Sequence, residues 1–124
     1  MHTNLHVLLV DDDALLRRAL ARFFRGLGWR VSEATDGLDA LRCLDTTPAP
    51  VDVLLTDIDM PMMGGLALRA AALVRFPLLP VLLMSGRSQA LPPGAAFLAK
   101  PASVAEIRAA ALALIPPARV AAVA

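Results

Sequence analysis

The chain has 124 residues, of which 57% are hydrophobic and 4% aromatic, and its formal net charge at pH 7 is +1. This length and composition suit one domain with a core of small aliphatic side chains. The near-neutral charge gives no electrostatic basis for nucleic-acid binding, and no apolar run reaches the roughly 18 residues that span a bilayer.

Short runs typical of β-strands alternate with helical patterns along the chain. Strands are expected over residues 5–10, 30–34, 52–56, 80–85 and 96–99, and helices over 13–27, 36–45, 65–75 and 103–115. Five strands that alternate with helices predict the α/β class, with a parallel sheet that carries helices on both faces. One domain is therefore expected over residues 1–118, followed by a C-terminal tail over 119–124.

Capping residues set the boundaries of the first and last helices. Asp13 stands where an N-cap is expected, and Ser103 with Glu106 has the spacing of a capping box. In the first helix, the apolar residues at helical spacing are expected to form one stripe: Leu15, Leu16, Ala19, Leu20, Phe23, Phe24 and Leu27. The arginines of that helix are expected on its solvated face: Arg17, Arg18, Arg22 and Arg25.

The fourth crossover is short for a connection that contains a helix. Only ten residues, GRSQALPPGA, separate Ser85 from Ala96, and they include Pro92, Pro93 and Gly94. A parallel crossover with its helix needs at least about 10 to 12 residues. We therefore predict that residues 86–95 are largely irregular and that the fourth helix is reduced or absent.

Carboxylates follow two strands of the predicted sheet. Asp11 and Asp12 come after the first strand, and Asp57 comes after the third. In an open parallel sheet, ligands bind outside the carboxyl ends of the strands, where the strand order reverses. Clustered carboxylates would be driven toward their neutral forms unless a cation lay among them. Mg²⁺, which takes oxygen ligands, is the natural candidate.

Two further polar groups follow the last two strands. Ser85 follows the fourth strand, and Lys100, the single lysine of the chain, follows the fifth. A lysine in so arginine-rich a chain indicates a place that suits a compact point charge. An aspartate can attack a phosphoryl group to form an acyl phosphate, and nearby cations neutralise the phosphoryl oxygens. This set of groups therefore suits phosphoryl transfer to Asp57.

Four motifs, in this order, resemble the receiver domain of two-component response regulators. They are VDDD at 10–13, DIDMP at 57–61, LLMSG at 82–86 and FLAKP at 97–101, and together they cover nearly the whole chain. The resemblance implies a flavodoxin-like, doubly wound, five-stranded parallel sheet with the order 2-1-3-4-5. It also implies a phosphoacceptor in a two-component phosphorelay, whose Mg²⁺-dependent phosphorylation switches its signalling surface.

The same resemblance assigns the central residues of the site. It implies that Asp57 is the phosphoacceptor. It also implies that Asp11 and Asp12 hold Mg²⁺, together with Asp57 itself and the backbone carbonyl of Asp59. The Lys100–Pro101 peptide bond is often cis in this family.

The remaining site residues have roles at the switch and at the rim. By the resemblance, Ser85 is the hydroxyl that turns toward the phosphoryl group, and Lys100 is the salt-bridge partner of that group. Phe97 is the aromatic whose rotamer reports phosphorylation, with ordinary core packing as the alternative. Asp59 and Arg87 are expected to rim the pocket, either as an ion pair across its mouth or as independent solvated side chains.

Three other residues that can carry chemistry are expected to be structural. Cys43 is the only cysteine, which excludes an intramolecular disulfide, and a buried helical thiol is expected. His2 and His6 have no third ligand or adjacent nucleophile, so neither is expected to bind a metal.

The N-terminus lacks the charged region of a signal peptide, and a cytoplasmic protein is therefore expected.

A receiver of this kind implies a histidine kinase or a histidine phosphotransfer domain as phosphoryl donor, and no enzymatic turnover beyond its own dephosphorylation. For the arginines of the first helix, the alternative to a solvated face is a docking role for that donor. No nucleic-acid or membrane partner is expected, and the reduced fourth helix favours a monomer. Two other functions stay open: a haloacid-dehalogenase-like phosphatase that uses Asp57 and Asp59, and an interaction module that no longer accepts phosphate.

Overall fold

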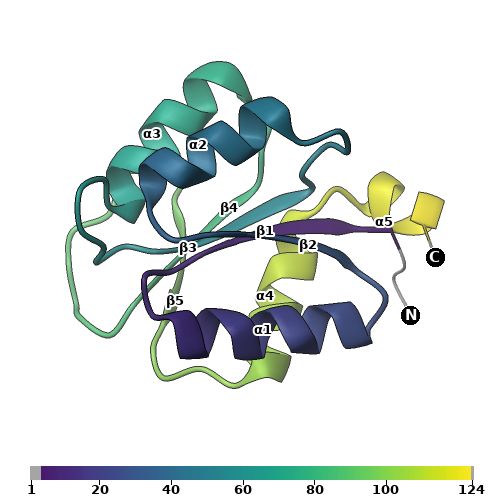
Figure 1. Ribbon diagram of the computed structural model, residues 1–124, viewed down its shortest axis with the longest axis horizontal. Coiled ribbons are helices and arrows are strands. Elements are labelled where there is room, and N and C mark those ends of the chain that lie inside the picture. The colour runs from purple at the N-terminus through teal and green to yellow at the C-terminus, as the bar shows by residue number, and fades with distance from the viewer. Residues whose placement is uncertain (1–3, 124) are drawn as a thin grey trace.

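Five parallel strands form the central sheet in the order β2-β1-β3-β4-β5 (Figure 1). The computed structural model describes residues 4–123, and its strands are β1 (His6–Val10), β2 (Arg30–Ala34), β3 (Val53–Asp57), β4 (Val81–Ser85) and β5 (Ala96–Ala99). The register pairs Val10 with Thr56, and Asp57 with Met84, so the carboxyl ends of β1, β3 and β4 meet at one edge. The predicted flavodoxin-like sheet and its strand order are confirmed.

Helices cover both faces of this sheet. They are α1 (Ala14–Gly26), α2 (Gly37–Thr46), α3 (Gly65–Arg75), α4 (Val104–Leu114) and α5 (Pro117–Val123). Figure 1 shows α2 and α3 on one face and α1 and α4 on the other. Within residues 4–123, no helix is long and apolar enough to cross a membrane.

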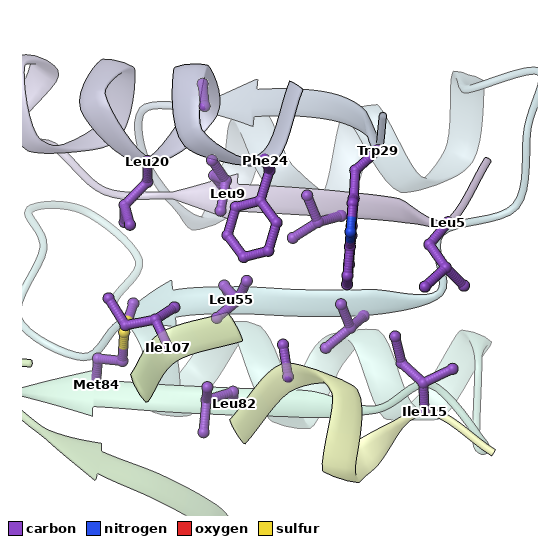
Figure 2. Close-up of a cluster of buried hydrophobic side chains, with 14 residues drawn as sticks. Leu5, Leu9, Leu20, Phe24, Trp29, Leu55, Leu82, Met84, Ile107 and Ile115 are labelled. Carbon is purple, nitrogen blue, oxygen red and sulfur yellow. The ribbon is translucent and has the colours of Figure 1, made fainter. Parts of the chain in front are cut away.

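Alternation along the strands divides the core into two clusters. Leu9 and Leu55 point to the face of α1 and α4, where they belong to one cluster with Phe24 (Figure 2). Leu8 and Leu54, one residue earlier on each strand, point to the face of α2 and α3. Full burial of such a side chain contributes about 1.5–3 kcal/mol to stability. Because a slip of one residue would exchange the two faces, this alternation fixes which residues end each strand.

The predicted helix caps are confirmed. The Asp13 side chain accepts hydrogen bonds from the backbone N–H groups of Leu15 and Leu16, which would otherwise lack partners. Ser103 and Glu106 form the complete capping box of α4, with each side chain accepting from the backbone of the other residue.

The predicted buried stripe of α1 is wrong in part. The buried residues of this helix are Arg17, Leu20, Ala21 and Phe24, which follow the i, i+3, i+4, i+7 spacing of one stripe. Leu15 lies on the opposite side of the helix and is 81% exposed. Arg17 therefore lies inside the fold, where the sequence predicted a solvated side chain.

The fourth crossover contains no helix, as predicted. Residues 86–95, between β4 and β5, form only bends and turns. Two backbone N–H groups there bind acceptors that are close in sequence: Ala95 donates to the Pro92 carbonyl at 3.2 Å, and Arg87 donates to the Ser85 hydroxyl at 3.0 Å. The segment thus crosses from β4 to β5 without the repeated bonds of a helix.

Hydrogen exchange should detect this irregular segment. We expect the amides of residues 86–95 to exchange much faster than those of α3, whose hydrogen bonds repeat along the helix. The measurement is native-state exchange followed by NMR, with α3 as the internal reference. A contiguous block of protected amides between β4 and β5 would contradict the expectation.

The C-terminal residues form helix α5, which runs across the predicted domain boundary at residue 118. The helix begins at Pro117, and proline is favoured at the first helical position. Arg119 binds both carboxylate oxygens of Asp52, through Nε at 2.9 Å and Nη2 at 3.2 Å. These contacts attach α5 to the segment that leads into β3. The boundary itself stays a prediction, and Ala124 and His2 lie outside the described residues.

His6 and Cys43 have structural surroundings. The buried His6 ring lies at the start of β1, with Nε2 at 2.8 Å from the Ser32 hydroxyl. Its Nδ1 lies 3.1 Å from the Ala49 carbonyl oxygen and 3.2 Å from that of Pro50. Cys43 is a free, partly buried thiol on α2, and burial raises its pKa. Neither side chain belongs to the acidic cluster found among the described residues.

His6 should make folding stability depend on pH. Burial lowers the pKa of His6 below its usual value of 6.5, although the two backbone carbonyls oppose the shift. The unfolded chain therefore binds the proton first, so the contribution is fully present above pH 6.5 and is lost as the pH falls toward the folded pKa. We expect urea unfolding at pH 7.5 and 5.5 to show a larger loss of stability for the wild type than for His6→Gln. Equal losses would contradict this assignment.

Candidate functional site

Three carboxylates converge at the carboxyl edge of the sheet. Asp57 is the last residue of β3, and Asp11 and Asp12 follow β1 directly. Because β1 and β3 are neighbours, one oxygen from each carboxylate lies within 4.8 Å of the others. Asp11 and Asp57 are 4% and 7% exposed, whereas Asp12 is exposed. Such a group of oxygens fits a hard divalent cation that keeps some of its ligands on the solvent side.

Lys100 lies among these carboxylates. Its Nζ is 3.2 Å from Asp11 Oδ2 and 3.3 Å from Asp57 Oδ1. Burial raises the pKa of the Asp57 carboxyl; the Lys100 ammonium opposes this rise, and the charge of Asp11 adds to it. Burial by itself would lower the pKa of Lys100, but Asp11 and Asp57 outweigh that effect and the net shift is upward. Lys100 therefore stays protonated and offsets part of the repulsion between the acids.

Arg17 holds the loop that carries Asp11. Its Nη1 donates to the Asp11 backbone carbonyl at 2.8 Å, and its Nε donates to Glu33 Oε1 at 3.1 Å. Asp11 Oδ1 in turn accepts from the backbone N–H of Asp13 at 2.9 Å. Helical periodicity does not predict this positioning role, because it gives no sign that an arginine reaches a neighbouring strand end.

Glycine lets α3 approach the backbone of Asp57. The N–H of Gly65 donates to the Ile58 carbonyl at 3.0 Å. A Cβ at Gly65 would lie 2.4 Å from the Asp57 carbonyl oxygen and 2.9 Å from the Ile58 Cα. Both contacts are with backbone, which cannot rotate away as a side chain can. The first turn of α3 thus lies directly against the Asp57 peptide, and only glycine fits there.

A hydrogen-bonded network surrounds Ser85 at the end of β4. The Ser85 hydroxyl donates to Asp59 Oδ2 at 2.8 Å, and Gln89 Nε2 donates to the hydroxyl at 3.0 Å. The second carboxylate oxygen of Asp59 forms an ion pair with Arg87. These hydrogen bonds, from Arg87 first and from Ser85 second, lower the pKa of Asp59. Both predicted rim residues, Asp59 and Arg87, therefore belong to the same network as the predicted switch hydroxyl. Gln89, which was not among the predicted site residues, belongs to it as well.

Phe97 lies within β5, and Pro101 follows the end of that strand. Phe97 is opposite Leu83 in the register, is partly buried and packs against the core cluster beneath α2 and α3. Its proposed role as a rotameric reporter stays a prediction. The Lys100–Pro101 peptide bond is cis.

The sequence matches the response regulator receiver domain over residues 7–112. This range contains strands β2 to β5, all of β1 except its first residue, and every candidate site residue from Asp11 to Lys100. The chain belongs to this family. The resemblance inferred from the four motifs is thereby confirmed, and membership favours the receiver over the dehalogenase-like phosphatase.

Receiver regions of known regulators are similar in sequence to this receiver domain. It is 44% identical over 80 residues, 64% of this chain, to the DNA-binding transcriptional regulator NtrC of Klebsiella pneumoniae. It is 36% identical over 86 residues, 69% of this chain, to the transcriptional regulatory protein PrrA of Mycobacterium tuberculosis. These matches span 17% and 36% of the two regulators, so the similarity concerns the receiver domain and not the whole of either protein.

The structure of this receiver domain is also similar to a solved one. The receiver domain from the hybrid histidine kinase CckA superposes with a TM-score of 0.79 at 29% sequence identity. That comparison covers 90% of this chain and 99% of the other. The sheet and the strand ends that hold the acids therefore follow the pattern of an experimentally determined receiver.

Proposed function

We propose that Asp57 of this receiver domain accepts a phosphoryl group and forms an acyl phosphate. The observation that supports this most directly is the Asp57 carboxylate at the sheet edge, with Lys100 Nζ 3.3 Å from one oxygen and two further acids close by. A carboxylate so placed can attack in line from the strand end, while Lys100 neutralises charge on the phosphoryl oxygens.

Mg²⁺ fits the donor set that Asp57 shares with Asp11 and Asp12. All three offer carboxylate oxygens, the usual protein ligands of this ion, and their closest oxygens lie within 4.8 Å of one another. We assign the backbone carbonyl of Asp59 as a further ligand, following the family resemblance. When bound, the ion supplies positive charge that neutralises phosphoryl oxygens. Arg17 contributes by fixing the Asp11 carbonyl, and therefore the loop that presents both acids.

A histidine kinase or histidine phosphotransfer domain is the proposed donor. Exposed apolar side chains lie near this site edge, where α1, α2 and α4 begin and the β3–α3 loop turns: Leu15, Leu16, Leu38, Met62 and Val104. Arg18 and Arg22 of α1 are exposed as well. Exposed apolar side chains with basic neighbours suit a helical donor domain that must bring a phosphohistidine to Asp57.

The chain is proposed to act as a phosphoryl carrier and switch, without enzymatic turnover of a substrate. A monomer in the cytoplasm, with no nucleic-acid or membrane partner, is the form in which we expect it to work. The absence of a helix among residues 86–95 reduces the face that this family uses to dimerise, which supports the monomer.

Labelling with acetyl phosphate tests this function. The intact mass of the protein should increase by one phosphoryl group per chain when Mg²⁺ is present, and should stay unchanged when the ion is removed with EDTA. In the same preparation, p-nitrophenyl phosphate should not be turned over. Absence of labelling, or sustained hydrolysis of p-nitrophenyl phosphate, would overturn the proposal in favour of the interaction module or the phosphatase.

The Arg87–Asp59 ion pair should slow the loss of the phosphoryl group. The two side chains are 75% and 36% exposed, so their pair contributes only about 0–1 kcal/mol to stability. The family resemblance implies that this pair rims the site, where it would obstruct the in-line approach of water to the acyl phosphate. We expect Arg87→Ala to speed dephosphorylation severalfold with little change in melting temperature.

The control for this prediction is Arg75→Ala. Arg75 forms a similarly exposed ion pair with Asp45, which does not belong to the site, and its loss should leave dephosphorylation unchanged. Dephosphorylation rates of Arg87→Ala, Asp59→Ala and the double variant complete the measurement. Strictly additive effects of the two substitutions would remove the pair from the mechanism.

A further inference from the structure

The Ser85 hydroxyl has no free hydrogen-bonding capacity. It accepts from the Arg87 backbone N–H and from Gln89 Nε2, each at 3.0 Å, and it donates to Asp59 Oδ2 at 2.8 Å. A serine hydroxyl has one hydrogen to donate and two lone pairs that accept. All three are engaged, and Ser85 is only 1% exposed, so solvent offers no alternative partner.

The single hydrogen of this hydroxyl cannot serve two acceptors at full strength. Ser85 ends β4, and the preceding residue, Met84, lies opposite Asp57 in the register, so the hydroxyl belongs to the strand end beside the phosphoacceptor. If Ser85 is to donate to a phosphoryl oxygen on Asp57, it must release the oxygen of Asp59. The two acceptors are therefore in direct competition.

We propose that Asp59 is a positioning residue that holds the Ser85 hydroxyl in its resting orientation and competes with a phosphoryl group on Asp57 for the hydroxyl hydrogen. This inference rests on the proposed function, because it presumes that Asp57 carries a phosphoryl group. It assigns Asp59 a role in the switch itself, beyond its backbone carbonyl at the metal and beyond the access of water.

Arg87 and Gln89 also contact the two residues of this hydrogen bond. Arg87 pairs with the second oxygen of Asp59, so the carboxylate keeps a charged partner after Ser85 leaves. Gln89 lies in the irregular crossover and binds the same hydroxyl oxygen. Rotation of that oxygen toward Asp57 consequently changes its contact with Gln89 and transmits the switch to residues 86–95.

Beryllium trifluoride, bound with Mg²⁺ as a phosphoryl analogue, measures this competition without phosphate turnover. Its dissociation constant is obtained by fluorine NMR for the wild type, Asp59→Ala, Ser85→Ala and the double variant. We expect Asp59→Ala to tighten binding about tenfold, the order expected when one competing hydrogen bond to a charged group is removed.

Measurements in the Ser85→Ala background separate two effects of Asp59 on the affinity for beryllium trifluoride: its hydrogen bond with Ser85 and its negative charge. Asp59→Ala also removes a negative charge near an anionic ligand, and that part should persist when Ser85 is absent. The increase in affinity caused by Asp59→Ala should therefore be clearly smaller in the Ser85→Ala background than in the wild type. Asp59→Asn keeps an acceptor oxygen for Ser85, so it should tighten binding less than Asp59→Ala.

The outcomes distinguish the two proposals. An equal gain from Asp59→Ala with and without Ser85 overturns the competition and leaves Asp57 as phosphoacceptor. Failure of the wild type to bind beryllium trifluoride at all overturns the proposed function, and the competition with it.

Discussion

Asp57→Asn should abolish labelling by acetyl phosphate. The substitution replaces the attacking carboxylate with a carboxamide that cannot form an acyl phosphate under these conditions. No other acid takes its place: Asp11 and Asp12 follow a different strand, and Lys100 lies between Asp11 and Asp57. The intact mass measured after incubation with Mg²⁺ should therefore show unmodified protein.

Loss of labelling by unfolding can be separated from loss of the nucleophile. Burial raises the pKa of Asp57, so its ionised form is less favourable in the folded chain than in the unfolded chain at neutral pH. Removing that charge should leave the melting temperature unchanged or higher. Asp45→Asn is the matched control, because this half-exposed acid on α2 pairs with Arg75 outside the site. Wild-type labelling of Asp57→Asn, or lost labelling of Asp45→Asn, would refute the assignment.

Local signals in the sequence predicted most of the fold. Strand β2, helix α3 and strand β5 have the predicted bounds, and α1 differs by one residue at each end. Each of these elements is bounded by a cap, a glycine or a charged strand end, and its apolar pattern has the period of its own structure. The missing fourth helix followed from length and prolines alone. What these elements share is that neighbouring residues determine them.

Features that depend on tertiary contacts were harder to predict. The apolar residues of α1 fit two overlapping stripes, and only packing against the sheet decides that Arg17 is buried while Leu15 is exposed. Helix α5 was taken for a tail, although Pro117 at a first helical position was a usable signal. Likewise, the family resemblance predicts Asp59 at the rim with Arg87 but no side-chain rotamer, so it does not predict the hydrogen bond from Ser85 to Asp59.

Gly65→Ala should destabilise the fold at the point where it supports the phosphoacceptor. The new Cβ would lie 2.4 Å from the Asp57 carbonyl oxygen, so α3 or the end of β3 must move. Overpacking of this kind costs about 1–3 kcal/mol, and it should appear in urea unfolding as a lower midpoint with an unchanged slope.

Gly26→Ala is the matched control for this substitution. Gly26 ends α1, and apart from its chain neighbours and the adjacent backbone of its own helix no heavy atom lies within 4 Å of the position of a new Cβ, so alanine should be neutral or stabilise by up to about 1 kcal/mol. Because the clash at Gly65 acts on the Asp57 peptide itself, the folded fraction of Gly65→Ala should also be labelled by acetyl phosphate more slowly than the wild type. Equal urea unfolding midpoints for the two variants would contradict the close packing of α3 against the Asp57 backbone.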